Sequence, residues 1–489
     1  MKMVLFNKKD SQMDRLALGI CTGVFFFWFL LLSYKYQHYG YYDWDLAISD
    51  QVVWDLCHGS AFSSLIGYHF LANHANYIAF LIAPVYYFFP HPLTLIFLKL
   101  FSFAGGSFVL YKIIDKFWDK RLALIVMLLY ITHPANIFML FYEFKFENLA
   151  VGIIFLLFYF FQIERLTAFL ITAFILMLIK ENMSLIVVLF GLYGLLTKKE
   201  KRGAWGALPL FLGVSFFVVT MAVIIPFIRR PLPFSESIYW SLYGHFTKIH
   251  GSFIKTVSFY IFQLFSVLFS KQNLIYLYDL FGPFLFFALA SCQVLLLGLP
   301  ILFQNLLSKA YQMHTIYFHY SATIVPLIAI AAGLSLGVLR SKFHILTYRI
   351  LCFLSGLIFL FNVYHFGPMW QDEIAGWVNK PAKIRDYLIQ QIPKEAGVVA
   401  SFDFLSHLDH RKNLYSFYNV LRNINYITGQ EPFALPKDVQ YALIDFNDPW
   451  FLPSNNSKID NNHLKDFFSS GHWIVQRQYG SIILFKRRG

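Results

Sequence analysis

The residues that can do chemistry lie in short polar turns between long apolar runs. The first turn follows an apolar run at about 16–34 and contains Asp43, Asp45 and Asp50, three carboxylates within eight residues. A carboxylate can take a proton from a reacting hydroxyl group if it lies within hydrogen-bond reach. The alternative is that these side chains only interact with water on an exposed loop.

Further turns add acids, lysines and histidines. The loop with the three aspartates continues through His58, His69 and His74. Later turns contain Glu143, Lys145 and Glu147; Lys180 and Glu181; and His314, His319 and Tyr320. Ionisable groups at membrane depth cost about 2.5–3.5 kcal/mol each and are functional hypotheses by default. Glu143 and Glu147 are four residues apart and share a face if their turn is helical. Structural ion pairs are the alternative, between these glutamates and Lys145 or Lys180, or between Lys180 and Glu181.

Few features indicate a metal or a known catalytic motif. His69 and His74 are five residues apart in a loop, which is weak spacing for metal ligands and favours hydrogen bonding or substrate positioning. We therefore assign no metal ligand, and the cofactor stays unassigned, with a divalent cation still open. The sequence has no phosphate-binding Gly-rich loop, nucleophile elbow, HExxH or CxxC. Gly105-Gly106 lies inside an apolar run and indicates close helix packing.

The amino-acid composition indicates which kind of structure these turns connect. Hydrophobic residues make up 58% and charged residues 14%, whereas soluble domains carry about 25% charged residues. Runs such as 17–34 and 316–339 are long enough to cross about 30 Å of hydrocarbon as helices. The net charge of +13 fits lysines and arginines in cytoplasmic turns, and no basic stripe indicates nucleic acid. The four cysteines form no disulfide framework.

We expect an α-helical polytopic membrane protein with about 11 transmembrane helices. They run at about 16–34, 93–114, 122–141, 148–162, 166–180, 182–197, 204–228, 255–270, 279–303, 321–339 and 346–365. The apolar stretch 74–89 is too short to cross and contains Pro84, so it should dip into the membrane or lie on its surface.

The positive-inside rule orients these helices in the cell (inner) membrane. It places the N-terminus and the basic turns at 115–121, 198–202 and 340–342 in the cytoplasm. A transmembrane domain at 1–367 then has outer loops at 35–75 and 229–254. The extracytoplasmic tail, 368–489, is predicted to be a small soluble α/β domain.

Alternating helical and strand patterns define that tail. The predicted helices are 382–391 and 463–468, and the predicted strands are 397–400 and 441–445. Residues 473–485 are predicted to form a hairpin that turns at Tyr479-Gly480. Strands that alternate with helices favour a β/α arrangement.

Several of these motifs resemble those of a known family. The segment 45–51, with Trp54 and Gly59, resembles the first-loop signature of the membrane family called domain of unknown function 2079. That family is similar to the GT-C glycosyltransferases. The resemblance covers about 40–450 and continues through His74, Ala83-Pro84, 89–92, 143–147, 180–182, 319–322 and 407–411. The chain departs from the family where Lys145 and Phe146 replace His and Pro, and where Asn182 replaces Asp.

The resemblance implies a glycosyltransferase that moves a sugar from a polyprenyl-phosphate donor to an extracytoplasmic hydroxyl group, with inversion. Asp45 would be the general base, and Asp50 is the second candidate. Lys180 and Lys145 would contact the lipid phosphate. The implied cavity is lined by His74, Glu143, Glu147, Glu181, His319 and Tyr320. The expected partners are the lipid-linked sugar, membrane lipids and an unidentified glycan, lipid or protein acceptor, with no nucleic acid.

Two other classes of function remain open at this point. A transporter or flippase of a lipid-linked or anionic solute could use the same carboxylates and lysines as binding groups or proton relays. Inverted halves would favour it, and the sequence shows no such internal symmetry. A non-catalytic scaffold with a GT-C shell would tolerate Ala at all three first-loop Asp positions.

Overall fold

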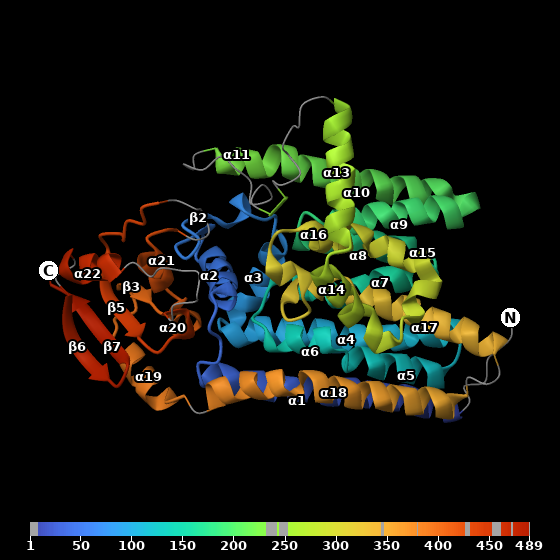
Figure 1. Ribbon diagram of the computed structural model, residues 1–489, viewed down its shortest axis with the longest axis horizontal. Coiled ribbons are helices and arrows are strands. Elements are labelled where there is room, and N and C mark those ends of the chain that lie inside the picture. Colours follow the sequence, from blue (N-terminus) through green and yellow to red (C-terminus); the bar gives the residue numbers. More distant parts are fainter. Residues whose placement is uncertain are drawn as a thin grey trace.

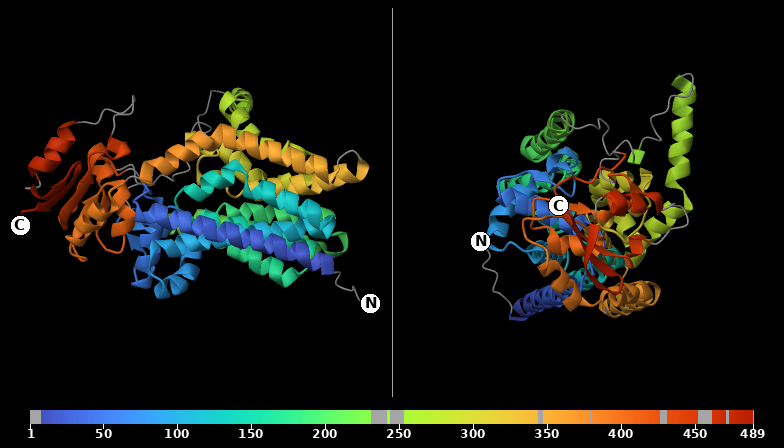
Figure 2. Two further views of the ribbon diagram at one scale, coloured as in Figure 1. Left: turned by 90° about the horizontal axis from the view of Figure 1, so that it is seen from below. Right: turned by 90° about the vertical axis from the view of Figure 1, so that its left-hand side faces the viewer.

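The computed structural model describes residues 8–230, 242–243, 253–343, 347–378, 380–425, 431–451, 461–470 and 473–488. A bundle of helices lies at one end and a small mixed sheet at the other, and helix α1 (Lys8–Gln37) begins at the end of the bundle far from the sheet (Figures 1 and 2). Most of the predicted loop 229–254 lies outside the described residues.

Within the described ranges, six helices are long and apolar enough to cross a membrane. They are α1 (Lys8–Gln37, apolar from Ser11), α4 (Pro92–Phe117), Gly203–Arg229, Phe287–Leu307, α17 (Val325–Lys342) and α18 (Tyr348–Val378). Gly203–Arg229 includes α10 (Leu208–Val219) and α11 (Ile225–Arg229), and Phe287–Leu307 includes α15 (Cys292–Leu295) and α16 (Leu299–Leu307). A seventh span results if α5 (Lys120–Ile131) and α6 (Pro134–Phe141), bent by 49°, count as one. A polytopic helical protein is thus confirmed, by length and composition.

Shorter apolar helices account for the remaining predicted spans. They are Phe146–Gln162 (which includes α7, Ala150–Gln162), α8 (Leu166–Ile179), α9 (Met183–Thr197) and Phe259–Leu268 within α13 (Phe253–Leu268). The count of about 11 full spans is therefore too high among the described helices. The stretch 74–89, predicted to be too short to cross, contains the short apolar helix α3 (Ile78–Phe88).

The predicted span at 279–303 exists but begins later, at Phe287, and runs to Leu307. Helix α14 (Lys271–Phe281) ends before Pro283, which has no N–H for the helical ladder. Leu285 and Phe286 adopt left-handed conformations, with φ of 50° and 58°, before helical structure resumes at Phe287.

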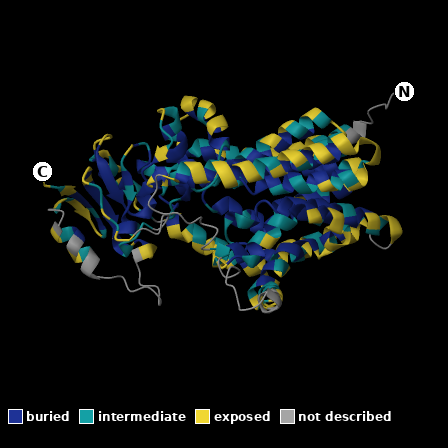
Figure 3. Cartoon of the chain, turned by 90° about the horizontal axis from the view of Figure 1, so that it is seen from above, coloured by how far each residue is buried: buried dark blue, intermediate teal, exposed yellow. Residues whose placement is uncertain are grey.

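The outer faces of the bundle carry large apolar side chains. Phe26, Phe27 and Leu30 of α1 and Phe353 and Leu360 of α18 are exposed, and Figure 3 shows exposed residues along the outer helices of the bundle on its upper side. Apolar surface on this scale is expected where a protein meets lipid. Inside the bundle, a Cβ at Gly106 would lie 2.8 Å from Gly152 Cα, so α4 and α7 approach closely, which confirms the close-packing prediction.

The segment after α1 is more ordered than the predicted loop. It contains α2 (Asp45–Cys57), the antiparallel pair β1 (Phe62–Ser63) and β2 (Tyr68–His69), and α3. Helix α2 is buried on most sides, including at polar positions such as Asp50 and Gln51. It therefore lacks the single apolar stripe by which a surface helix is recognised in a sequence.

The C-terminal sheet has five strands in the order β4-β3-β5-β7-β6. Strand β3 (Gly397–Ala400) is parallel to β4 (Leu414–Ser416) and β5 (Val439–Asp445), and β7 (Ile482–Arg487) is antiparallel to β5 and β6 (Trp473–Tyr479). Helices α19 (Ala382–Gln390), α20 (Phe402–Leu408), α21 (Phe417–Arg422) and α22 (Asn461–Ser470) accompany it. The predicted strands, helices and hairpin are confirmed, while β4, α20 and α21 are additional. Helix α18 continues past its predicted end at about 365 to Val378.

Candidate functional site

Asp45 lies in the first turn of α2 and is 6% exposed. One carboxylate oxygen is 2.7 Å from Lys145 Nζ, and the other accepts a hydrogen bond of 2.8 Å from the Tyr142 hydroxyl group. Residues about 100 positions apart therefore converge on one carboxylate. Both oxygens of the Asp45 carboxylate therefore have a partner, and one of these partners, Lys145, is a cation.

Glu143 holds the start of α2 in place. Its carboxylate accepts hydrogen bonds from the backbone N–H groups of Asp43 (2.8 Å) and Leu46 (2.7 Å). The first N–H groups of a helix have no partner within the helix and need one elsewhere. Burial, together with the carboxylates of Asp43 and Asp45, raises the pKa of Glu143. Glu143 therefore fixes the first turn of α2, in which Asp45 lies.

Glu147 belongs to a second ion pair. Residues 142–145 are not helical, so Glu143 and Glu147 do not share a helix face. Glu147 accepts a 2.6 Å bond from Lys180 Nζ, and both side chains are 12% exposed. Burial alone would lower the pKa of Lys180, but the carboxylates of Glu147 and Glu181 outweigh that effect and raise it. Lys180 therefore remains a cation.

Glu181 is fully buried and joins the turn after α8 to the turn before α3. It accepts a bond from the Ala75 N–H (2.8 Å) and lies 2.8 Å from His74 Nδ1. Burial lowers the pKa of His74. The predicted alternative in which Lys180 and Glu181 neutralise each other is replaced by these two separate pairings.

His319 and Tyr320 complete this cluster. The His319 ring is 5.2 Å from the Tyr142 ring and 4.1 Å from the Tyr320 ring. Burial lowers the pKa of His319 to about 4, so the ring is neutral at neutral pH. His319 Nδ1 is buried without a hydrogen-bond partner among the described residues. His314 lies elsewhere, bonded to Asn273 and the Ser308 carbonyl group.

Sequence reasoning missed Lys35, Lys99 and Tyr142. Lys99 Nζ donates to the carbonyl oxygens of Leu140 (3.0 Å) and Tyr142 (2.7 Å), and Lys35 Nζ donates to that of Phe141 (2.7 Å). These are C-terminal carbonyl groups of α6, which favour cations. The two lysines thus fix the turn that presents Tyr142. A lysine inside an apolar run, such as Lys99, was the available signal.

Asp50 lies apart from Asp45. The two are five residues apart on α2, which turns the second side chain about 140° around the helix axis. Asp50 accepts a 2.7 Å bond from the Tyr86 hydroxyl group, and its other oxygen lies 2.9 Å from His410 Nε2. Burial and the Asp50 carboxylate raise the pKa of the neighbouring Asp409. The two predicted bases therefore belong to different clusters.

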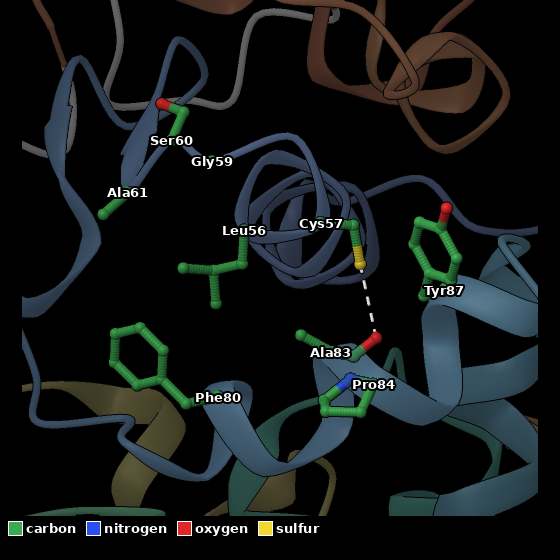
Figure 4. Close-up of a pocket in the computed structure, with 9 residues that line it drawn as sticks. All are labelled: Leu56, Cys57, Gly59, Ser60, Ala61, Phe80, Ala83, Pro84 and Tyr87. Atoms are coloured by element: carbon green, nitrogen blue, oxygen red, sulfur yellow. Dashed lines mark hydrogen bonds between the residues drawn. The ribbon is translucent and has the colours of Figure 1, made fainter.

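A pocket of about 510 Å³ lies between α2 and α3 (Figure 4). Its lining includes Leu56, Phe80 and Pro84, and none of the nine residues that line it is charged. Cys57 Sγ donates a 3.3 Å hydrogen bond to the Ala83 carbonyl group at its wall. This pocket offers apolar surface, whereas the ionisable groups lie in the Asp45 cluster.

The helical bundle and the mixed sheet together define a polytopic membrane protein with a GT-C-like fold. ArnT from Cupriavidus metallidurans bound to undecaprenyl phosphate has a similar structure, with a TM-score of 0.55, 12% identity, and coverage of 96% of this chain and 97% of that one. The chain itself belongs to the family described as predicted membrane protein (DUF2079), which it matches over residues 37–484.

Two further structures are less similar. ArnT from the same organism in the apo state has a TM-score of 0.49 and 11% identity, with 94% of this chain and 96% of that chain covered. The Archaeoglobus fulgidus oligosaccharyltransferase in complex with Zn and sulfate has a TM-score of 0.37 and 12% identity, with coverage of 84% and 64%. No curated protein sequence matches the chain. At these identities the comparisons show the fold alone.

Proposed function

We propose that this protein is a glycosyltransferase that moves a sugar from a polyprenyl-phosphate donor to an acceptor hydroxyl group on the extracytoplasmic side of the membrane. The observation that carries the proposal is the buried Asp45 carboxylate, held by Tyr142 and Lys145 beside a second pair, Lys180 and Glu147. The similar ArnT structure, which holds undecaprenyl phosphate, supports the choice of donor class.

In the proposed reaction, Asp45 is the general base. It accepts the proton of the acceptor hydroxyl group as that oxygen forms a bond to the anomeric carbon. The bond from this carbon to the phosphate oxygen breaks on the opposite face, and its electron pair leaves with the polyprenyl phosphate. The sugar configuration is therefore inverted.

Lys145 and Lys180 would receive the donor phosphate. Ammonium groups form strong charge-assisted hydrogen bonds with phosphate, and positive charge stabilises the phosphate as it leaves. The Lys145 side chain is 28% exposed and therefore accessible to a ligand. When Lys145 turns toward the phosphate, Asp45 loses its cationic partner and becomes a better proton acceptor. Donor binding would thus activate the base.

The first experiment measures lipid binding and turnover with the full chain in lipid nanodiscs. Undecaprenyl phosphate and a panel of hexosyl and pentosyl undecaprenyl phosphates serve as probes, and mass spectrometry detects released undecaprenyl phosphate. We expect binding by the unaltered chain, weaker binding by Lys180→Ala, and binding without turnover by Asp45→Asn. If neither bare nor sugar-loaded lipid binds the unaltered chain, the donor assignment is wrong, and transport of another solute becomes the better explanation.

A further inference from the structure

A second cluster of ionisable groups joins the bundle to the C-terminal sheet. It consists of Asp50 on α2 and of Asp409 and His410, which directly follow α20. Their ligand-type atoms all lie within 4.8 Å of one another. The Tyr86 hydroxyl group is 2.7 Å from an Asp50 oxygen and 2.8 Å from His410 Nε2.

The two carboxylates are buried, and the basic group that contacts them among the described residues is the His410 imidazole, 2.9 Å from Asp50. Asp50 is fully buried and Asp409 is 2% exposed, and Asp409 Oδ2 has no hydrogen-bond partner within the described parts of the chain. The adjacent Arg411 guanidinium donates to the backbone carbonyl groups of Leu408 and Ala396. Buried charges are normally paired or coordinate a metal, because burying them alone is costly.

We propose that Asp50, Asp409 and His410 bind one divalent transition-metal ion that fastens the C-terminal unit to α2. Two carboxylate oxygens and one imidazole nitrogen suit Zn²⁺ or Mn²⁺. Ca²⁺ and Mg²⁺ prefer oxygen ligands alone. Small side-chain rotations would bring the three ligand atoms to metal distances of about 2.0–2.2 Å. Tyr86 would orient Asp50 through its hydrogen bond.

The position of the site indicates a structural role. Asp50 and His410 are 360 residues apart in the sequence. The same interface contains hydrogen bonds from Gln51 to the Arg411 carbonyl group (3.1 Å) and from the Leu414 N–H to Ser64 (2.9 Å). A metal ion here would cross-link these two parts of the chain. The inference does not depend on the proposed transferase activity.

A shared proton between Asp50 and Asp409 is the competing explanation, because it would also remove one buried charge. The two explanations predict opposite effects of Asp409→Asn. Without a metal, Asn removes an unfavourable charge, and the melting temperature stays the same or rises. With a metal, Asn removes a ligand, and both the bound metal and its stabilising effect are lost.

The test uses the full chain, purified in detergent through an affinity tag that does not bind metal ions. A chelator first removes bound metal from the protein. Separate samples are then incubated with Zn²⁺, Mn²⁺, Mg²⁺ or Ca²⁺. Elemental analysis after gel filtration should give about one Zn²⁺ or Mn²⁺ per chain, and add-back should raise the melting temperature by several degrees. Asp409→Asn should lose at least 90% of the bound metal. The matched control is Asp55→Asn, a buried carboxylate on the same helix outside the cluster, which should retain it.

Three results would overturn the inference. One is the absence of bound Zn²⁺ or Mn²⁺ in the unaltered chain at micromolar metal. Another is equal metal content in Asp409→Asn and the unaltered chain. The third is binding of only Mg²⁺ or Ca²⁺ at millimolar concentration. The unaltered chain alone decides the first and third, so they hold even if a variant fails to fold. Co²⁺ absorption bands that are lost in His410→Ala would identify the imidazole ligand independently.

Discussion

Replacing Asp45 with Asn tests the proposed chemistry most directly. The amide keeps the shape of the side chain and can still accept the hydrogen bond from Tyr142, but it cannot act as a base at neutral pH. A positioned general base contributes about 10²–10⁴-fold to a rate, which corresponds to about 2.7–5.4 kcal/mol of transition-state stabilisation. Because Asp45 is buried, loss of its ion pair with Lys145 also costs folding free energy, up to about 3–5 kcal/mol, so folding of the variant is checked first.

The assay is the single-turnover release of undecaprenyl phosphate from a sugar-loaded donor. We expect the single-turnover rate constant to fall about 10²–10⁴-fold. The donor concentration that gives half the maximal rate should stay within about threefold, because the lysines that bind phosphate remain. The control is Asp14→Asn, which also removes a carboxylate paired with lysines, Lys112 (3.0 Å) and Lys120 (2.8 Å), but outside the site. A folded Asp45→Asn variant that keeps more than a tenth of the rate would refute the base assignment.

Three further predictions address the phosphate, the packing and the pH response. Lys180→Met should weaken undecaprenyl phosphate binding about 10–100-fold, measured by thermophoresis, because one charge-assisted bond of about 1.5–3 kcal/mol is lost. Gly106→Val should lower the free energy of unfolding by about 1–3 kcal/mol, measured by thermal melts, because a Cβ would lie 2.8 Å from Gly152 Cα. The unfolded chain, with a His pKa near 6.5, binds more protons than the folded chain, where the pKa of His319 is about 4. The free energy of unfolding should therefore fall by about 3 kcal/mol as the pH drops from 7 to 4, and His319→Phe should flatten this slope.

Each of these predictions has its own contradicting result. Unchanged lipid affinity in Lys180→Met would remove Lys180 from the phosphate site. Gly105→Ala is the packing control, since a Cβ there meets nothing within 4 Å; equal losses for both glycine variants would contradict the close-approach argument. A pH slope that persists in His319→Phe would assign the proton uptake to other groups.

Hydropathy alone predicted most of the helices, because a segment that crosses the lipid bilayer must be long and apolar regardless of which helices it packs against. It failed at residues 282–286, where apolar residues on both sides conceal a break at Pro283. It also failed for α2, whose burial on most sides removes the apolar stripe that distinguishes a helix.

The partners within the candidate site were harder to predict. The resemblance to a known family identified Asp45, Lys145 and Lys180 as candidates. The contacts of Tyr142 and Lys99, in contrast, depend on the three-dimensional position of the C-terminal end of helix α6. The role of Glu143 as a partner of backbone N–H groups follows from the geometry of the α2 N-terminus, which no residue pattern encodes. Asp45 and Asp50 separate because α2 is helical, so reading that segment as a loop merged two clusters into one.

The 360-residue separation between Asp50 and His410 also has a consequence for biosynthesis. A ribosome that adds about 5–20 residues per second completes α2 roughly 20–70 s before it reaches the residues that cover it. Throughout that interval, Asp50 lacks His410 and Gln51 lacks the Arg411 carbonyl group, so the nascent chain presents a polar helix face that membrane chaperones could recognise. Translation products that stop before residue 409 retain this exposed face permanently, which makes them distinguishable from finished molecules and accessible to membrane proteases.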